Sequence, residues 1–345
     1  MSTAAAYSTV SAGAPFVRTE IERRPVGSHD VSIAIAYAGI CHSDIHAARE
    51  EWGSTHFPLV PGHEITGVVD AIGAEVTTFA VGDRVGVGCL VWSCGDCRWC
   101  AAGDEQFCAK RVGTYAAKDV DGTWTAGGYS QRVVVDDRFV LHIPDALPLD
   151  VAAPLLCAGI TTFSPLRHWK AGPGTRLGVI GLGGLGHMAV QFGHALGADV
   201  TLFSRTLDKE EDARSLGADR VVATADTSSL KPLRDSFDLI INTVSAGLPF
   251  DLYLRTLDVD GTLVNVGLPP EPTTLRIGSL VGNRRSMAGS PIGGIRETQE
   301  MLDFAAENGF GARIELIGAA EIDSAYERVV AGDVRYRYVI DTATI

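Results

Sequence analysis

Four of the seven cysteines in this 345-residue chain lie in one short stretch, with the spacing Cys94-x2-Cys97-x2-Cys100-x7-Cys108. Thiols this close in sequence cannot all form unstrained disulfides, whereas their thiolates can converge on one metal ion. The spacing predicts a zinc held by four sulfurs, which has no free position for a substrate and therefore organises a loop. An iron–sulfur centre is the other use of four cysteines, and the spacing alone leaves that alternative open.

A catalytic zinc is held by residue types that occur at three further positions: Cys41, His63 and Cys157. Two thiolates and one imidazole leave one position of a tetrahedral ion open to a substrate oxygen. Each residue alone is more often a buried thiol or a hydrogen-bonded histidine than a ligand, so the residue types do not decide this site. The last cysteine, Cys89, lies in an apolar run, and we expect it to be a buried core thiol.

A glycine-rich segment, Gly181-Leu-Gly-Gly-Leu-Gly186, follows the apolar run Arg176–Ile180 and precedes a predicted helix that ends near Gly197. Between a strand and a helix, this GxGxxG spacing predicts a dinucleotide-binding turn. Its glycines permit a tight turn, close approach of the pyrophosphate and close packing of the helix on the strand. The phosphates would lie at the positive end of the helix.

The next predicted strand, Asp199–Phe203, ends at the position that chooses between the two nicotinamide dinucleotides. An NAD site places Asp or Glu there to bind the ribose 2′-hydroxyl, but this chain has Ser204. The missing carboxylate, together with Arg205 and Lys209, favours the 2′-phosphate of NADP. An ordinary solvated loop with two basic residues is the alternative interpretation.

The predicted secondary structure that positions these residues changes along the chain, from short strands to alternating strands and helices. Residues 15–150 carry short β-rich runs, which predict a small barrel or sandwich. From residue 151 strands alternate with helical segments, which is typical of a parallel sheet. Near residue 290 two helices (around 298–305 and 324–331) and a strand (336–340) follow. We expect an α/β protein in which a doubly wound parallel-sheet domain (154–289) is inserted into a β-rich domain (1–153 and 290–345) with a cysteine lobe at 89–110.

The composition indicates what kind of protein this is and which partners it disfavours. A hydrophobic fraction of 46% with 21% charged residues indicates a globular chain. The formal net charge of −13 disfavours nucleic acid and anionic membranes as general partners. The chain shows neither a secretory signal nor an apolar run of the roughly 20 residues that a membrane helix needs. We therefore expect a cytoplasmic protein, and its odd number of cysteines argues against a disulfide framework.

Several motifs stand in one order along the chain: Gly62-His63-Glu64-x2-Gly67-x5-Gly73-x2-Val76, Gly82-Asp-Arg-Val85, the four-cysteine lobe and the GxGxxG turn. Over nearly the whole chain this order resembles that of the zinc-containing alcohol dehydrogenases of the medium-chain dehydrogenase/reductase superfamily. Four segments look like the NADP-dependent cinnamyl alcohol dehydrogenase branch: Cys41–His46, Leu155–Thr162, Ser204–Lys209 and Asn283–Ser290. The resemblance implies a GroES-like catalytic domain, a Rossmann cofactor domain, an active site between them and a homodimer.

The resemblance also implies roles for particular residues. Cys41, His63 and Cys157 would hold the catalytic zinc, giving two zinc ions per chain, and Glu64 could transiently approach that ion. Ser43 and His46 would pass the hydroxyl proton to solvent by way of the cofactor ribose. Asp44 would orient His63, although structural salt bridges are alternative roles for Asp44 and Glu64.

We expect the cofactor to be bound by residues of the glycine-rich turn and of the loops that follow the strands: Gly181, Gly183, Gly184, Leu185, Gly186, Ser204, Arg205, Thr206, Lys209, Thr243, Val266 and Ser290. Trp52 and Trp92 are candidates for an aromatic-lined substrate pocket.

The implied activity is hydride transfer between an alcohol and NADP, with zinc acting as a Lewis acid. Its substrates would be primary alcohols and aldehydes, either aromatic, such as the cinnamyl type, or medium-chain aliphatic. An NAD(P)-dependent polyol dehydrogenase is a second hypothesis, although that branch commonly has Glu where this chain has Cys157. A catalytically silent NADP-binding protein with one structural zinc is a third, and the intact Cys41, Ser43, His46 and His63 argue against it.

Overall fold

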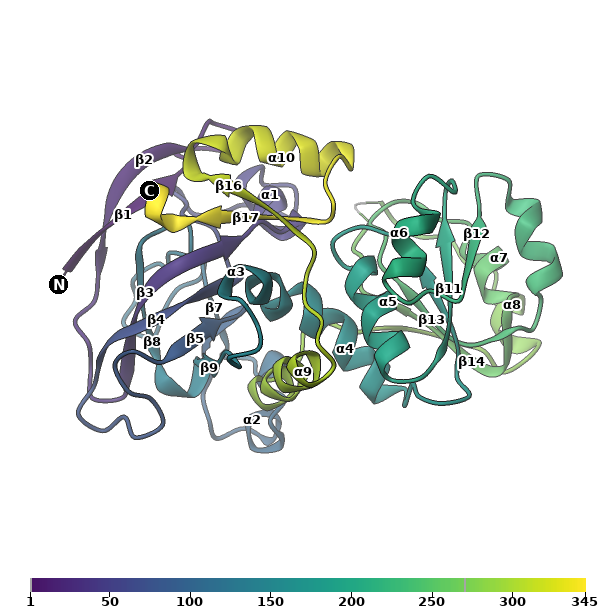
Figure 1. Cartoon of the computed structure of the whole chain (residues 1–345), viewed down its shortest axis with the longest axis horizontal. Coiled ribbons are helices and arrows are strands. Elements are labelled where there is room, and N and C mark those ends of the chain that lie inside the picture. The colour runs from purple at the N-terminus through teal and green to yellow at the C-terminus, as the bar shows by residue number, and fades with distance from the viewer. Residues whose placement is uncertain (1, 270) are drawn as a thin grey trace. The chain divides into compact units, whose positions relative to one another are not determined.

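The computed structural model describes residues 2–269 and 271–345, and the chain divides into two compact units (Figure 1). The first unit comprises Met1–Ile160 and Gly293–Ile345, and the second comprises Thr161–Ile292. The sequence placed the boundaries at 153/154 and 289/290, where the pattern of elements changes. The structure divides the chain a few residues later in both places, because Ala158 and Ile160 are buried within the first unit.

The first unit holds strands, α-helices and short 3-10 helices. They are β1 (Ser2–Ser8), β2 (Val17–Arg23), β3 (Asp30–Gly39), α1 (His42–Ala48), β4 (Ile65–Ile72), β5 (Arg84–Val87), β6 (Leu90–Trp92), α2 (Arg98–Ala102), η1 (Glu105–Phe107), β7 (Val112–Gly113), β8 (Arg132–Asp136), η2 (Asp137–Phe139), β9 (Leu141–His142), α3 (Leu149–Ala152), η3 (Ala153–Leu156), α9 (Ile295–Glu307), β16 (Ile314–Gly318), η5 (Ala319–Glu321), α10 (Ile322–Ala331), β17 (Arg337–Asp341) and η6 (Thr342–Thr344). Helix α4 (Ala158–His168) runs from this unit into the second.

A seven-stranded sheet forms the framework of the first unit, with the order β16-β17-β3-β4-β5-β9 and with β8 also paired to β3. Strand β3 pairs antiparallel with β4, β8 and β17, which explains why most of its residues are buried. The C-terminal segment therefore completes a sheet that the N-terminal segment begins. One core cluster joins both segments and includes Ile40, Ile45, Tyr129, Tyr326 and Ile340.

The elements expected from the sequence are confirmed here. The β-rich runs form β3, β4, β5 and β8, and the last predicted strand is β17. Helix α9 buries Thr298, Met301, Leu302 and Ala305, which is the face that the helical spacing predicts.

The second unit alternates strands and helices. They are β10 (Arg176–Ile180), α5 (Gly186–Ala195), β11 (Asp199–Ser204), α6 (Glu210–Ser215), β12 (Arg220–Ala223), η4 (Thr227–Leu233), β13 (Phe237–Asn242), α7 (Phe250–Leu254), β14 (Leu257–Asn265), α8 (Gly278–Val281) and β15 (Ser286–Gly289).

All strand pairs of this unit are parallel, in a six-stranded sheet with the order β12-β11-β10-β13-β14-β15. Helices α5 and α6 lie on one face of the sheet and α7 and α8 on the other (Figure 1). The chain reverses its direction of winding between β10 and β13, which is where dinucleotides bind in such sheets. The doubly wound cofactor domain and the α/β class expected from the sequence are confirmed.

Among the described residues, no single helix has the length and apolarity to cross a membrane. One bent pair, Leu149–Leu156 with Ala158–His168, meets those criteria by length and composition only.

Candidate functional site

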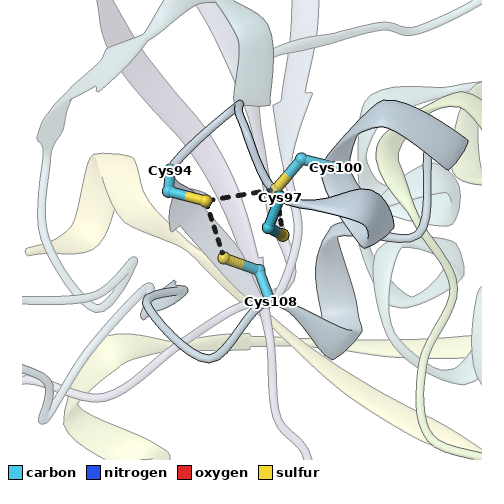
Figure 2. A group of neighbouring side chains, drawn as sticks. All are labelled: Cys94, Cys97, Cys100 and Cys108. Atoms are coloured by element: carbon cyan, nitrogen blue, oxygen red, sulfur yellow. Dashed lines mark hydrogen bonds between the residues drawn. The ribbon is translucent and has the colours of Figure 1, made fainter.

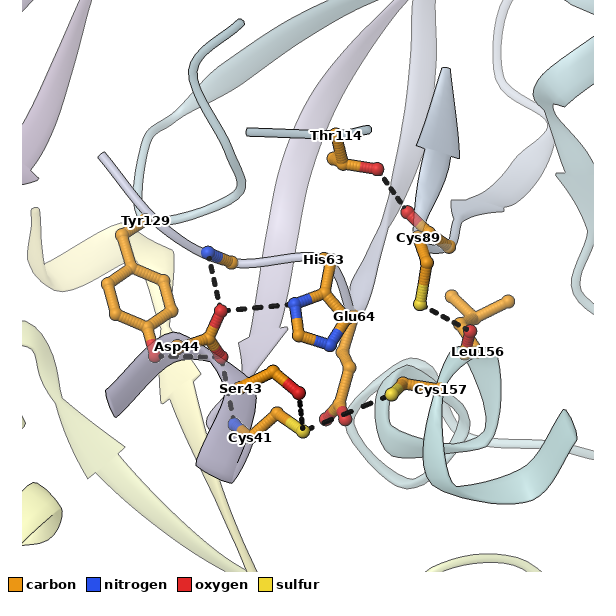
Figure 3. A network of polar contacts seen from close by, with 12 residues as sticks. Cys41, Ser43, Asp44, His63, Glu64, Cys89, Thr114, Tyr129, Leu156 and Cys157 are labelled. Carbon is orange, nitrogen blue, oxygen red and sulfur yellow. Dashed lines mark hydrogen bonds and ion pairs between the residues drawn. The ribbon is translucent and has the colours of Figure 1, made fainter. Parts of the chain in front are cut away.

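Three segments of the first unit bring the predicted catalytic ligands together (Figure 3). Cys41 immediately precedes α1, His63 lies just before β4, and Cys157 joins η3 to α4. One ligand atom from each, with a carboxylate oxygen of Glu64, lies within 4.8 Å of the others, and all four residues are buried. The Sγ atoms of Cys41 and Cys157 are 3.9 Å apart, although the residues are separated by 116 positions.

This donor set fits a zinc ion. Thiolates and an imidazole are the ligands that zinc prefers, and here two thiols and one imidazole converge. The Oε2 atom of Glu64 is buried and has no hydrogen-bond partner within residues 2–269 and 271–345. A buried, unpaired carboxylate oxygen beside thiols is suited to approaching a metal ion.

Asp44, near the start of α1, organises the ligand residues and is fully buried. Its Oδ1 accepts hydrogen bonds from the backbone N–H of Gly62 (3.1 Å) and from Nδ1 of His63 (3.0 Å), and its Oδ2 accepts one from the N–H of Cys41 (2.8 Å). Nε2 of His63 is thereby left as the ligand atom. Burial opposes protonation of His63, but the Asp44 carboxylate raises the pKa of this imidazole well above its ordinary value.

The other oxygen of Glu64 forms a buried ion pair with Arg337 on β17. A Cβ atom at Gly39 would collide with the Glu64 carboxylate, so this position requires glycine. Arg337 is not among the site residues expected from the sequence. Its signal is a cationic residue within the otherwise apolar run of the last strand, where an inward side chain needs a buried partner.

The proposed proton-relay residues lie on α1. The Oγ atom of Ser43 is 3.6 Å from Sγ of Cys41, which places this hydroxyl beside the ligands. His46 is one turn further along the helix, where its ring stacks on Trp52 with centroids 4.4 Å apart and Nδ1 pairs with Glu51. Trp52 is 49% exposed, so His46 lies at the end of the helix that is open to solvent.

The second pocket candidate, Trp92, has different surroundings. It lines a cavity of about 430 Å³ together with Trp124, Arg23 and Asp121, and none of the three predicted catalytic ligands lines this cavity. This cavity therefore does not place Trp92 beside the predicted catalytic ligands.

The four-cysteine lobe forms a second cluster (Figure 2). The Sγ atoms of Cys94 and Cys100 are 3.9 Å apart, those of Cys97 and Cys100 are 3.5 Å apart, and those of Cys94 and Cys108 are 3.5 Å apart. A backbone hydrogen bond from Cys94 lowers the pKa of Cys108 to about 7, which favours the thiolate that a metal requires. A metal ion bound by all four thiolates would have no free position for a substrate.

The predicted cofactor residues of the second unit gather at the carboxyl ends of its strands. Gly181 follows β10, Ser204 ends β11, Thr243 follows β13, Val266 follows β14 and Ser290 follows β15. Ligands of open parallel sheets bind at this edge, near the reversal of winding between β10 and β13.

The positions in this turn differ in why they carry glycine. Gly181 has a φ of +92°, which favours glycine, and a Cβ at Gly186 would collide with the carbonyl oxygen of Gly181. A Cβ at Gly183 would meet nothing within 4 Å, so the fold itself does not require glycine there. This open space fits the position where the backbone must approach a pyrophosphate.

The end of β11 carries no carboxylate at the position that distinguishes the two dinucleotides. Arg205 and Thr206 are exposed, and Lys209 donates a hydrogen bond from Nζ to the carbonyl oxygen of Leu182 in the glycine-rich turn (3.4 Å). The nearest acid in sequence, Asp208, accepts a hydrogen bond from the Thr206 hydroxyl (2.9 Å).

Two further residues border the ligand set although the sequence did not assign them to it. The expectation that Cys89 is a buried core thiol is wrong: it is partly exposed, and its Sγ lies 4.0 Å from the carbonyl oxygen of Leu156, next to Cys157. The Tyr129 hydroxyl donates to Oδ2 of Asp44 (3.4 Å) from an entirely different segment. Neither contact has a signal in the local sequence.

Two family models match the chain. Residues 27–145 match the alcohol dehydrogenase GroES-like domain, and residues 184–307 match the zinc-binding dehydrogenase family.

Known proteins resemble the chain over almost its full length. It is 58% identical to a probable formaldehyde dehydrogenase of Bacillus subtilis, over 97% of this chain and 96% of that protein. It is also 58% identical to the NADP-dependent alcohol dehydrogenase C 1 of Mycolicibacterium smegmatis, over 100% and 99% of the two chains. A crystal structure of the cinnamyl alcohol dehydrogenase of Helicobacter pylori, complexed with NADP(H), superposes with a TM-score of 0.93 at 42% identity, covering 99% of this chain and 98% of that one.

Proposed function

This chain belongs to the zinc-containing alcohol dehydrogenases of the medium-chain dehydrogenase/reductase superfamily, in the cinnamyl alcohol dehydrogenase branch, and we propose that it interconverts aldehydes and primary alcohols with NADP(H) as its dinucleotide. We propose aromatic aldehydes of the cinnamyl type and medium-chain aliphatic aldehydes as its substrates. The observation that carries this proposal is the convergence of Cys41, His63 and Cys157, with the Ser43 hydroxyl beside them.

In the proposed mechanism, Cys41, His63 and Cys157 hold a zinc ion that would act as a Lewis acid on the substrate oxygen while NADPH supplies the hydride. Asp44 fixes the tautomer and orientation of His63 through Nδ1. In the reduction direction His46, paired with Glu51, takes a proton from solvent and the Ser43 hydroxyl gives a proton to the substrate oxygen. Oxidation of the alcohol reverses this transfer. Glu64, held by Arg337, provides a carboxylate that can approach the ion when no substrate occupies the fourth position.

We propose NADP(H) because position 204 lacks the carboxylate that would bind a 2′-hydroxyl and repel a 2′-phosphate. Arg205 and Lys209 follow within the same loop and supply positive charge. The names of the Mycolicibacterium relative and of the Helicobacter complex support the same dinucleotide.

We further propose that each chain carries two zinc ions, that the enzyme is a homodimer and that it acts in the cytoplasm. Two thiol-rich clusters support the zinc count. Strand β15 ends its sheet, and the same unit exposes Leu268, Ile277 and Val281, which supports association of two copies. All seven cysteines are free thiols, which suits a reducing compartment. Light scattering that found only monomers would contradict the dimer.

An activity panel tests the proposed function. Purified enzyme is assayed with aromatic aldehydes, medium-chain aldehydes and polyols, each with NADPH and with NADH. We expect aldehyde reduction with NADPH at a kcat/KM roughly ten-fold or more above that with NADH. Turnover of polyols alone would favour the polyol dehydrogenase hypothesis, and a complete lack of turnover would favour the silent cofactor-binding protein.

A further inference from the structure

A third thiol borders the two ligand cysteines and has no role in the proposed mechanism. Cys89 lies between β5 and β6, with its sulfur turned toward the segment that carries Leu156 and Cys157 (Figure 3). The Cys89 Sγ is 4.0 Å from the carbonyl oxygen of Leu156, the residue directly before Cys157. The two thiols are also close enough for each to shift the pKa of the other, with the pKa of Cys89 lowered and that of Cys157 raised. Cys157 therefore has two thiol neighbours, Cys41 and Cys89.

The backbones that carry Cys89 and Cys157 also approach each other closely. A Cβ atom at Gly88 would lie 2.9 Å from the carbonyl oxygen of Leu156, so the residues directly before the two cysteines are in contact. A disulfide requires this kind of proximity, because its two Cα atoms must lie within about 7 Å of each other.

The three thiols differ in accessibility. Cys41 and Cys157 are buried, whereas Cys89 is partly exposed. The ligand atoms of Cys41, His63, Glu64 and Cys157 form a set within 4.8 Å of one another, and Cys89 lies outside that set. With metal bound, Cys89 is therefore the thiol of this group that keeps a free sulfur, and it is the least buried of the three cysteine residues.

We propose that Cys89 is a redox modification site: hydrogen peroxide oxidises its thiol, and Cys157 captures the product as a disulfide, which removes a ligand from the catalytic metal site. The effect on activity rests on the proposed function, because it requires Cys157 to hold the metal. Formation of the disulfide itself rests only on the placement of the two thiols.

The chemistry proceeds in two balanced steps. The Cys89 sulfur attacks one peroxide oxygen, the O–O bond breaks, and a sulfenic acid and one water form. The Cys157 sulfur, a thiolate when it serves as a metal ligand, then attacks the Cys89 sulfur, the S–O bond breaks, and the leaving hydroxide takes a proton from solvent to form a second water. Overall, two thiols lose two electrons to one peroxide. The product leaves Cys41 and His63 as two of the three ligands, and a thiol reductant reverses the disulfide.

The test compares zinc-loaded wild-type enzyme with the Cys89→Ser variant, each treated with graded hydrogen peroxide. Peptide mapping without reduction identifies cross-links, with fragmentation that separates Cys89 from Cys94 and Cys97. Activity is expressed relative to each protein's own untreated sample, before and after addition of dithiothreitol and zinc. We expect the wild type to form the Cys89–Cys157 cross-link and to lose most of its activity reversibly. The variant should form no such cross-link and lose activity more slowly.

Other outcomes would overturn the proposal. A wild-type map that shows only a Cys41–Cys157 bond, or only oxidation of the four-cysteine lobe, assigns the sensitivity to the metal ligands themselves. Equal rates and equal reversibility of inactivation in both proteins would show that Cys89 does not matter. If the variant does not fold, the wild-type map alone decides. If the cross-link forms in a protein that lacks aldehyde reductase activity before treatment, the proposed function fails while the disulfide stands.

Discussion

At the scale of single residues, one carboxylate holds the proposed metal ligands in place. Asp44 receives hydrogen bonds from His63, Cys41 and Gly62, so it joins two of the three ligand segments. It adds a negative charge behind the imidazole, which strengthens His63 as a ligand. Its fully buried position means that no solvent can replace these contacts.

Replacing this carboxylate with a neutral amide should weaken metal binding. In Asp44→Asn the amide can still accept a hydrogen bond, but the charge is lost, and we expect a roughly 10–100-fold lower zinc affinity. Competition with a chelator measures this affinity. Glu75→Gln is the control, because Glu75 is an exposed carboxylate that also pairs with a histidine, His29, at 3.0 Å. Equal zinc retention in both variants would contradict the role of Asp44.

The residue at the end of β11 should set the dinucleotide preference. In Ser204→Asp the new carboxylate would repel a 2′-phosphate and bind a 2′-hydroxyl, so we expect the preference to shift toward NAD. The measurement is the ratio of kcat/KM for NADPH to kcat/KM for NADH. An unchanged ratio would remove position 204 from the specificity determinants.

The sequence predicted single residues well where spacing carries the information. Four cysteines in one stretch indicated their cluster without further knowledge, because a short loop brings them together. The catalytic ligands needed the family resemblance, since only the fold brings Cys41 and Cys157 to one point. The contact of Cys89 joins distant segments and has no local pattern. Arg337 has a local signal in the last strand, but its partner Glu64 lies 273 positions earlier, so the sequence alone does not pair them.

At the scale of elements, the glycines of the glycine-rich turn fall into two groups: those that the backbone conformation requires and one that only cofactor binding would require. Gly181 and Gly186 are required by the turn and by the approach of α5 to β10, whereas Gly183 faces open space. The alternation of strands and helices that predicted this unit reflects burial of each strand on both faces of a parallel sheet.

Two alanine variants distinguish these requirements. We expect Gly183→Ala to keep the melting temperature of the wild type and to bind NADPH more weakly, because the added methyl group occupies space meant for the pyrophosphate. We expect Gly186→Ala to lower the melting temperature, since its Cβ would collide with Gly181. Thermal unfolding and NADPH fluorescence titration measure the two effects. Loss of stability in Gly183→Ala with full stability in Gly186→Ala would contradict this assignment.

The four-cysteine lobe is connected to the start of α9. The Glu105 carboxylate accepts a hydrogen bond from the N–H of Ile295 (3.0 Å), and Arg296 donates one to the carbonyl oxygen of Ala102 (3.0 Å). The lobe is therefore joined to a helix that lies 190 to 194 positions further along the chain.

Removing one sulfur from the lobe should loosen that helix. In Cys97→Ser we expect loss of the lobe metal and faster amide exchange in the first turn of α9, with the central strand β3 unchanged. Hydrogen–deuterium exchange resolves these segments. Unchanged exchange in residues 295–299 of a variant that has lost one metal ion would show that the lobe does not support α9.

At the scale of the whole molecule, the two chemical halves of the enzyme lie in different units. All the proposed metal ligands belong to the first unit, and the glycine-rich turn belongs to the second. The chain crosses from one unit to the other twice, so the insertion could be recognised from changes in sequence pattern. The positions of the boundaries could not, because α4 continues as one helix across the first of them.

The central claim is that Cys41, His63 and Cys157 hold a catalytic zinc in addition to the zinc of the lobe. Metal analysis of the purified wild type and of Cys41→Ser, alongside turnover and NADPH titration, tests it most directly. We expect about two zinc ions per wild-type chain and about one in the variant, which should bind NADPH but not turn over. A wild type with only one zinc ion, or a variant that keeps its turnover, would contradict the claim.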